Sequence, residues 1–290
     1  MDKYLLKIPE DKKNKDININ NVSYSKTRQP FKLMSNSYIS YINDSVKKYS
    51  QKEKNGYEDI IDFISLPKTL ENQLKEISKV FNIDLNNKNI YHDEKNNDKK
   101  NNSYDILLLT DNFDKIDNKH LYYYMKEEIE IPRLINSLSN NIKLLKDNKE
   151  SILIIKFYGL HTKATLDLLT YFNNFFNKIY IYKPKSTSYF TKDLYFILKD
   201  LTTNSINKIN INNVKEIKWI SSMIDNYNYN KYFNNLSNEL AMNEYNYVNN
   251  AISFIDGNNY RGSEYRKYKE IQEKNDKEWI ELYENVKVSI

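Results

Sequence analysis

Glycine and cysteine are the residues that this sequence most clearly lacks. Its 290 residues include no cysteine and only four glycines, where a chain of average composition would carry roughly twenty glycines. Without cysteine there are no disulfides, thiolate metal sites or cysteine nucleophiles, and three scattered histidines leave little for a zinc site. Neither G-x-G-x-x-G nor G-x-x-x-x-G-K-[ST] occurs, which excludes P-loop NTPases and ordinary dinucleotide enzymes.

Long apolar runs are also absent. No stretch of eighteen uninterrupted apolar residues exists, and residues 1–16 lack the apolar core of a signal peptide. We therefore expect no membrane partner and a cytoplasmic location. The chain is 40% hydrophobic and 14% aromatic, which is too apolar for a disordered protein. Its length suits one large domain or two small ones.

The basic charge comes almost entirely from lysine. The net charge is +5, from 40 lysines and four arginines balanced against 39 acidic residues, and there are 44 asparagines. Lysine, asparagine, isoleucine and tyrosine are encoded by A/T-rich codons, so genome bias explains much of this composition. Arginine would be favoured for bidentate contacts to phosphate or guanine. The charge is thus compatible with RNA binding but does not argue for it.

The pattern of apolar residues divides the chain into three parts. We expect a polar arm over 1–55, an α/β domain over 56–205 and a helical extension over 206–290. Short apolar runs predict strands in the middle part, at 59–64, 88–92, 104–111, 151–157, 179–183 and 194–199. Helical spacing predicts helices from Pro67, over 121–145 with a break possible at Pro132, over 164–176, and over 263–286 with Trp279 and Leu282 on the apolar side.

Strands alternating with helices imply a Rossmann-like, mostly parallel sheet, and the last two strands, joined without a helix, imply one antiparallel strand. In open α/β sheets, ligands bind at the carboxyl ends of the strands. The residues expected there are Ile64 to Pro67 after the first strand, Asp111 after the third and Lys156 near the end of the fourth, while Asp193 enters the last strand. These residues are the candidates for a functional site.

Residues 58–201 resemble the FtsJ-like ribose 2′-O-methyltransferases, a family that includes viral cap methyltransferases. SILIIKFYG resembles the family's strand with the catalytic lysine, and YDILLLTDNFD its strand ending in the catalytic aspartate. KPKSTSYFTKDLYFIL is similar to its K-P-x-S-S-R…S-x-E-x-Y-x-V stretch, and IIDFISLPKTLENQL to its S-adenosylmethionine motif D-L-x-A-A-P-G-G-[FW]-S-x-x-L. The resemblance implies a methyltransferase sheet.

The resemblance also implies site residues. Lys156 would deprotonate the ribose 2′-hydroxyl, with Asp111 and Asp193 as its acidic neighbours. A further lysine of the family would fall near Asn43, where none is in register. Each candidate also has a structural interpretation: Lys156 can extend to solvent, Asp111 can cap a turn, and Asp193 can simply begin a strand.

The cofactor loop departs from the family's pattern. Asp62 and Pro67 are retained, but Ile64, Lys68 and Thr69 stand where small residues or glycines let the backbone approach S-adenosylmethionine. Ser65 lies in the same loop. Side chains would project where the ligand should lie, so the sequence predicts a methyltransferase fold that has lost, or nearly lost, its cofactor. S-adenosylmethionine is the expected cofactor if the protein is active, and otherwise there is none.

These features lead to three hypotheses about function. The first is a catalytically degenerate regulatory subunit in viral-type mRNA capping, because the chain also resembles the non-catalytic small subunits of poxvirus capping enzymes. Its partner would be a larger subunit with guanylyltransferase and guanine-N7 methyltransferase activities, and packaging into virions would accompany that role. The second is an active RNA cap 2′-O-methyltransferase. The third is a structural component of an RNA-containing assembly.

Overall fold

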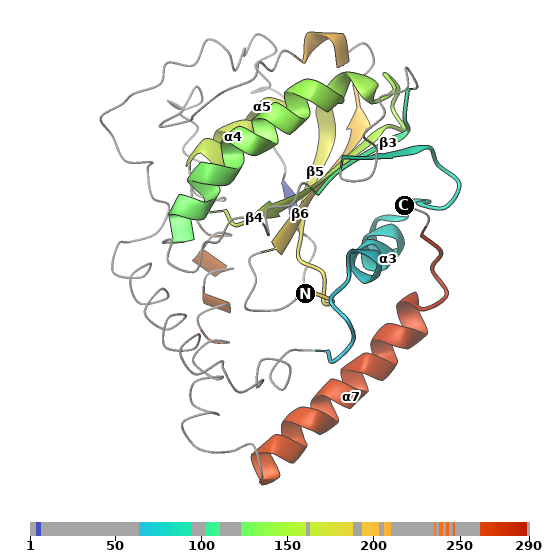
Figure 1. Cartoon of the computed structure of the whole chain (residues 1–290), viewed down its shortest axis with the longest axis vertical. Coiled ribbons are helices and arrows are strands. Elements are labelled where there is room, and N and C mark those ends of the chain that lie inside the picture. Colours follow the sequence, from blue (N-terminus) through green and yellow to red (C-terminus); the bar gives the residue numbers. More distant parts are fainter. Residues whose placement is uncertain are drawn as a thin grey trace.

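The computed structural model describes residues 4–6, 64–93, 103–110, 123–160, 163–187, 193–202, 206–209 and 262–288, with isolated helical positions between 235 and 246. These residues form a mixed α/β fold around one six-stranded sheet (Figure 1). The strands are β1 (Tyr4–Leu6), β2 (Ile90–His92), β3 (Ile106–Leu109), β4 (Ile152–Tyr158), β5 (Phe176–Tyr182) and β6 (Asp193–Leu201). The helices are α3 (Leu70–Phe81), α4 (Tyr123–Asn141), α5 (Lys163–Phe172) and α7 (Ser263–Tyr283), with short 3-10 turns η5 (Ile142–Leu144) and η6 (Ile206–Lys208).

The strand order is β1-β5-β6-β4-β3-β2. β2, β3 and β4 are parallel neighbours, β6 runs antiparallel between β4 and β5, and β1 pairs antiparallel with β5. Four strands therefore run in one direction and two in the other. The predicted α/β class and the antiparallel last strand are confirmed. The prediction of a single antiparallel strand is wrong, because residues 4–6 of the expected arm add β1 at the edge.

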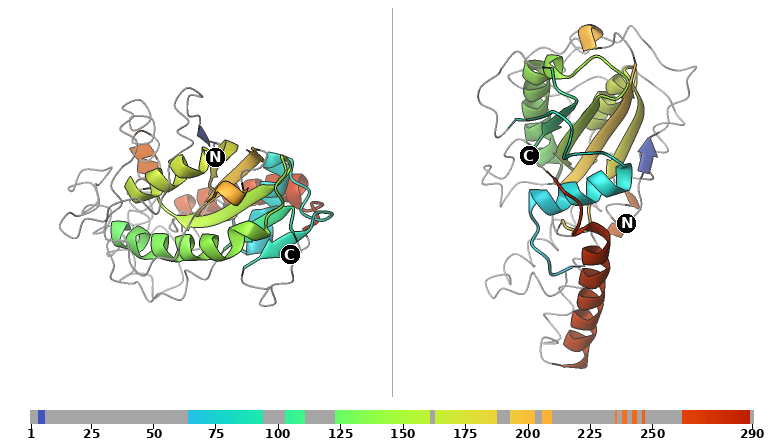
Figure 2. Two further views of the ribbon diagram at one scale, coloured as in Figure 1. Left: turned by 90° about the horizontal axis from the view of Figure 1, so that it is seen from above. Right: turned by 90° about the vertical axis from the view of Figure 1, so that its right-hand side faces the viewer.

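Helices cover both faces of the sheet. The larger core cluster joins α4 and α5 to residues such as Leu107 and Leu109 of β3, and a second cluster joins α3 to Ile106 and Leu108 of the same strand. Figure 2 shows the resulting layers, with α4 and α5 on one side of the sheet and α3 and α7 on the other. Because both faces are buried, the strands read in sequence as continuous apolar runs rather than alternating ones.

The helix boundaries follow local chemistry. Thr69 caps α3, and its Oγ1 accepts a hydrogen bond from the Asn72 N–H at 3.2 Å, so the helix begins after Pro67 rather than at it. Asn82 ends α3 in the left-handed conformation, with φ 51°. α4 continues through Pro132 without a break. α5 ends at Phe172, four residues before the predicted limit.

Three further predictions have distinct outcomes. Residues 59–63 of the expected first strand lie outside the described residues, and Ile64 is in no strand. The C-terminal helix is confirmed as α7, and Trp279 is buried, but Leu282 is 51% exposed. Tyr283, four residues after Trp279, occupies the buried face instead. No helix in the described part of the chain is both long and apolar enough to cross a membrane.

Candidate functional site

The sheet register brings two predicted site residues close together. Lys156 lies in β4 opposite Tyr195, and Asp193 opens β6 opposite Tyr158. Their backbones are therefore two register positions apart at the carboxyl end of β4. Lys156 is partly buried. Asp111 and Asp62 lie outside the described residues.

The segment that resembles a cofactor loop is engaged by the C-terminal helix. Ile64 is 1% exposed and forms a small apolar cluster with Trp279 and Tyr283 of α7. The Ser65 N–H donates to Asp276 Oδ1 at 2.8 Å, and the Ser65 hydroxyl donates to Oδ2 of the same carboxylate. A backbone amide that would face a ligand in the family is therefore bonded to a side chain of α7.

The next residues of this segment form the beginning of α3. Pro67 is exposed, and its carbonyl oxygen accepts a hydrogen bond from Asn72 Nδ2 at 2.7 Å. The Lys68 carbonyl accepts from Gln73 Nε2 at 3.4 Å, and Thr69 is the N-cap. Thr69 satisfies an N–H of the first turn of α3, and the two carbonyls bond side chains of the same turn, so residues 67–69 have a structural role.

A buried carboxylate lies nearby, and sequence reasoning gave it no role. Glu76 of α3 is fully buried and accepts four hydrogen bonds. Its Oε2 accepts from the Tyr182 hydroxyl at 3.0 Å and the Lys185 N–H at 2.8 Å. Its Oε1 accepts from the Ser186 N–H at 2.7 Å and Trp279 Nε1 at 2.8 Å. Glu76 therefore joins α3, the loop after β5 and α7.

We call this cluster the Glu76 hub; its members are Glu76, Tyr182, Lys185, Ser186 and Trp279. It resembles an anion-binding site that is already filled by a carboxylate of the chain. Two successive backbone N–H groups point at one carboxylate, as in the backbone nests that bind anions. Burial, followed by the charge of Glu76, raises the pKa of the Tyr182 hydroxyl above its ordinary value. The same two causes, in the same order, raise the pKa of Tyr283. The tyrosines are therefore kept neutral.

No feature of the sequence identifies Glu76. On α3 it lies to the side of the stripe formed by Leu70, Leu74, Ile77 and Phe81, a flank where a solvated glutamate normally occurs. Its donors are 106, 109, 110 and 203 residues away. Only the tertiary structure brings them together.

A second buried polar pair lies between α3 and the sheet. The Tyr195 hydroxyl donates to Gln73 Oε1 at 2.5 Å, and Tyr195 and Gln73 are 0% and 3% exposed. Tyr195 is the register partner of Lys156, so this pair lies beside the predicted catalytic lysine. Its sequence signal was weak, because Gln73 reads as an ordinary polar helix residue.

The carboxyl ends of β2 and β3 carry a further polar group that was not predicted. His92 Nε2 lies 2.5 Å from Thr110 Oγ1, and both residues are buried. The Thr110 N–H donates to Asp93 Oδ1 at 2.9 Å, and the Ser137 hydroxyl donates to Oδ2 at 3.4 Å. These contacts tie two strands to α4. Within the described ranges, no three His, Asp or Glu side chains form a group that could hold a metal ion.

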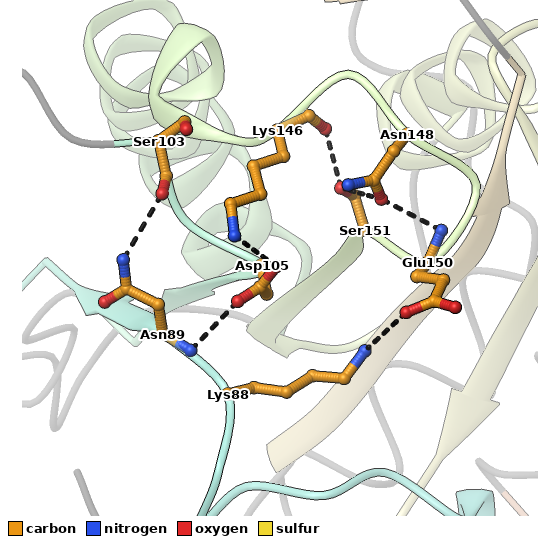
Figure 3. Close-up of polar contacts among 8 residues, drawn as sticks. All are labelled: Lys88, Asn89, Ser103, Asp105, Lys146, Asn148, Glu150 and Ser151. Atoms are coloured by element: carbon orange, nitrogen blue, oxygen red, sulfur yellow. Dashed lines mark hydrogen bonds and ion pairs between the residues drawn. The ribbon is translucent and has the colours of Figure 1, made fainter.

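The opposite, amino edge of the sheet has a different polar network (Figure 3). Lys146 Nζ donates to Asp105 Oδ1 at 2.7 Å, and the Asn89 N–H donates to Asp105 Oδ2 at 3.1 Å. Lys88 Nζ lies 3.8 Å from Glu150, and the Ser151 hydroxyl donates to the Lys146 carbonyl at 2.6 Å. The network links the residues that precede β2, β3 and β4.

The neighbours of Asp105 favour the ionised form of its carboxyl. Partial burial raises the pKa of its carboxyl, but the hydrogen bonds from Lys146 and Asn89 and the charges of Lys146 and Lys88 outweigh it, so the pKa is lower than usual. Ligands of α/β sheets bind at the carboxyl ends of the strands, so this edge is not the candidate site.

Neither the protein-family models nor the curated proteins compared with this chain gave a match. The structure itself places the chain in a class: a mixed α/β protein with a mostly parallel sheet covered by helices on both faces. Any finer identity depends on the local chemistry of the site.

Proposed function

We propose that this chain is a catalytically degenerate protein of methyltransferase fold that acts as a regulatory subunit in viral-type mRNA capping. Its partner would be a larger subunit with guanylyltransferase and guanine-N7 methyltransferase activities. The observation that supports the loss of catalysis is the contact between α7 and the loop that resembles a cofactor loop, at Ile64 and Ser65.

Binding S-adenosylmethionine along this loop would require α7 to leave. Displacing it would expose Ile64, Trp279 and Tyr283, which are 1%, 5% and 8% exposed. Exposing a buried large apolar side chain costs about 1.5–3 kcal/mol, and losing a hydrogen bond to a charged group about 1.5–3 kcal/mol. For three side chains and one hydrogen bond, even the low end of these values totals roughly 6 kcal/mol, a loss of about 10⁴-fold in affinity. The chain is therefore a poor receptor for this cofactor.

The order of the described strands supplies no ligand crevice either. Ligand crevices in doubly wound sheets form where the strand order reverses direction. From β2 through β3 and β4 to β5, the chain crosses the sheet in one direction, and α4 and α5 both pack on the same face. Because β2 is hydrogen-bonded directly to β3, no strand can lie between them. The described parallel strands thus contain no reversal.

One observation favours the alternative, an active S-adenosylmethionine-dependent RNA 2′-O-methyltransferase. The register places Lys156 and Asp193 two positions apart, next to the Tyr195–Gln73 pair. A lysine beside an acidic residue at a strand end suits deprotonation of a ribose hydroxyl. If this alternative holds, Lys156→Ala abolishes methylation of capped RNA, and Glu71→Gln on the exposed side of α3 does not. Unchanged methylation in Lys156→Ala would exclude it.

Calorimetric titration of the full-length chain with S-adenosylmethionine tests the loss of the cofactor site. We expect no heat of binding at millimolar cofactor. Micromolar binding would contradict the proposal and favour the active enzyme. The double variant Asp276→Ala, Trp279→Ala, which weakens the contact of α7 with the loop, shows whether α7 is the obstacle: binding gained only in this variant identifies α7, and binding in neither identifies the side chains of the loop.

A second experiment tests the partner. Affinity-tagged chain should co-purify with a protein that has guanylyltransferase activity, and adding the chain should stimulate guanine-N7 methylation by that partner. Absence of both effects would contradict a capping role and favour a structural component of an RNA-containing assembly.

A further inference from the structure

The Glu76 hub connects two parts of the molecule that are otherwise separate in sequence. One carboxylate accepts hydrogen bonds from the loop after β5, through the Lys185 and Ser186 amides, and from α7, through Trp279. The Ser186 amide and the Trp279 indole share a single oxygen, Oε1. Figure 1 shows the C-terminal end of α7 near α3, which carries Glu76, and the rest of α7 projecting away from the sheet.

α7 has a second, separate anchor. Asp276 accepts the N–H and the hydroxyl of Ser65, three residues before Trp279 on the helix. Residues three apart lie on neighbouring positions of one helix face, so both anchors engage when α7 docks. The apolar contact between Ile64, Trp279 and Tyr283 lies with them. α7 is therefore held by one anchor at residue 65 and another at the hub.

We infer that α7 is a latch whose docking through Trp279 sets the order of the loop at residues 183–187, with Glu76 as the coupling residue. When Trp279 leaves, the fully buried Oε1 of Glu76 loses one of its two donors. A buried charged oxygen does not remain under-bonded without cost, so water enters or the carboxylate turns. Either change alters the bonds to Lys185 and Ser186.

The Asp276 anchor makes the proposal specific. Asp276 bonds to Ser65 and to no atom of the hub in the described contacts, so loosening it should free Ser65 and leave the loop at 183–187 in place. A general loosening of α7 would instead affect both segments through either anchor. The two anchors therefore separate coupling through Glu76 from a common destabilisation.

Hydrogen exchange of the full-length chain, followed by mass spectrometry, tests the latch. Trp279→Phe keeps an aromatic side chain and removes the indole N–H. We expect exchange of the Lys185 and Ser186 amides to become about tenfold faster, the effect of losing one hydrogen bond to a charged acceptor. Asp276→Ala should speed exchange at Ser65 alone, and Ile271→Ala, at a position that is 56% exposed, should change neither segment.

The helical amides of α4 at 134–138, a segment with Leu134, Ile135 and Leu138 in the core, serve as the internal reference for folding. Unchanged exchange at Lys185 and Ser186 in Trp279→Phe would overturn the inference, and so would equal acceleration at 134–138, which would mean global destabilisation. Glu76→Gln is the second variant: it keeps one oxygen and should loosen both the loop and α7. The measurement needs no cofactor, RNA or partner, so its failure would leave the proposed capping role untouched.

Discussion

Two carboxylates stabilise opposite edges of the same sheet, and one of them is buried while the other is partly exposed to solvent. Glu76, at the carboxyl end of β5, is fully buried and accepts hydrogen bonds from four donors, none of them a lysine or arginine side chain. Asp105, before β3 at the amino edge, has a side chain that is 26% exposed and pairs with Lys146 at 2.7 Å. The first depends on neutral donors in a dry site, the second on a cation within reach of water.

The difference shows how burial decides the strength of a polar contact. At the amino edge, water replaces a lost partner, so each contact is worth little. At the Glu76 hub, a lost partner leaves a buried polar atom without water, and the full desolvation cost appears. We therefore expect the carboxyl edge to dominate both stability and the coupling between distant segments.

Removing the Glu76 carboxylate should have the largest effect. Glu76→Ala leaves buried donors on the loop, the sheet and α7 without an acceptor. We therefore expect the free energy of unfolding, measured in urea, to fall by about 4 kcal/mol, as it does when one partner of a buried pair is removed. Glu71→Gln is the matched control on the same helix, because Glu71 is 59% exposed and pairs with Lys75. It should lose about 0.4 kcal/mol. Similar losses in the two variants would refute the contrast between buried and exposed carboxylates.

A backbone test at the carboxyl edge comes next. Gly159 follows β4 with φ 97°, a conformation that other residues rarely adopt. Gly159→Ala should therefore destabilise the chain by about 2 kcal/mol, measured by urea unfolding. Gly262, the N-cap of α7, has φ −138° and no atom within 4 Å of an added Cβ, so Gly262→Ala should cost less than about 1 kcal/mol, the loss of a favoured cap residue. A small loss at Gly159 would mean that this end of β4 relaxes easily.

The neutral pair beside Lys156 allows a finer test. Tyr195→Phe removes the donor to Gln73 Oε1 and should lose about 1.5 kcal/mol. Adding Gln73→Leu makes both partners apolar, and the double variant should be more stable than the sum of the single losses predicts. A double-mutant cycle from urea unfolding gives the coupling. Strict additivity would show that the hydroxyl and the amide do not depend on each other.

The sequence predicted elements that depend on local pattern. The run Ile152 to Phe157 was sufficient to predict a strand, because a strand buried on both faces reads as a continuous apolar run. The apolar stripe of α3 was sufficient to predict a helix, because a helix buried on one face has apolar residues at helical spacing. β1 could not be predicted, since three residues carry no period and its pairing with β5 is a tertiary event. Leu282 was misplaced because a helix turns 100° per residue, and Tyr283 fits the buried face better.

The candidate site divides in the same way. Lys156 and Asp193 came from strand order, and the register places them near each other. Glu76 escaped prediction because its environment comes from residues more than a hundred positions away. The contact of α7 with Ile64 and Ser65 could not be predicted either, because the sequence of a charged, amphipathic helix does not indicate which residues it will pack against.

We expect the smallest loss of stability at the amino edge, and its dependence on pH tests whether the loss is electrostatic. Lys146→Met should cost about 0.7 kcal/mol at pH 7, since the pair is partly exposed. Because Lys146 helps to lower the pKa of Asp105 despite its burial, the stabilisation is present above the unfolded pKa, about 3.9, and is lost as pH falls through the lower folded value. The difference between wild type and variant should therefore shrink in urea titrations as the pH falls below the unfolded value, and should be lost once Asp105 is protonated in the folded state as well. Lys149→Met, at a lysine that is 76% exposed, should change stability by less than about 0.3 kcal/mol. If the loss of stability in Lys146→Met persists undiminished in acid, Lys146 stabilises the chain by packing rather than by its charge. The contrast between the two edges would then depend on the burial of apolar atoms instead of charge.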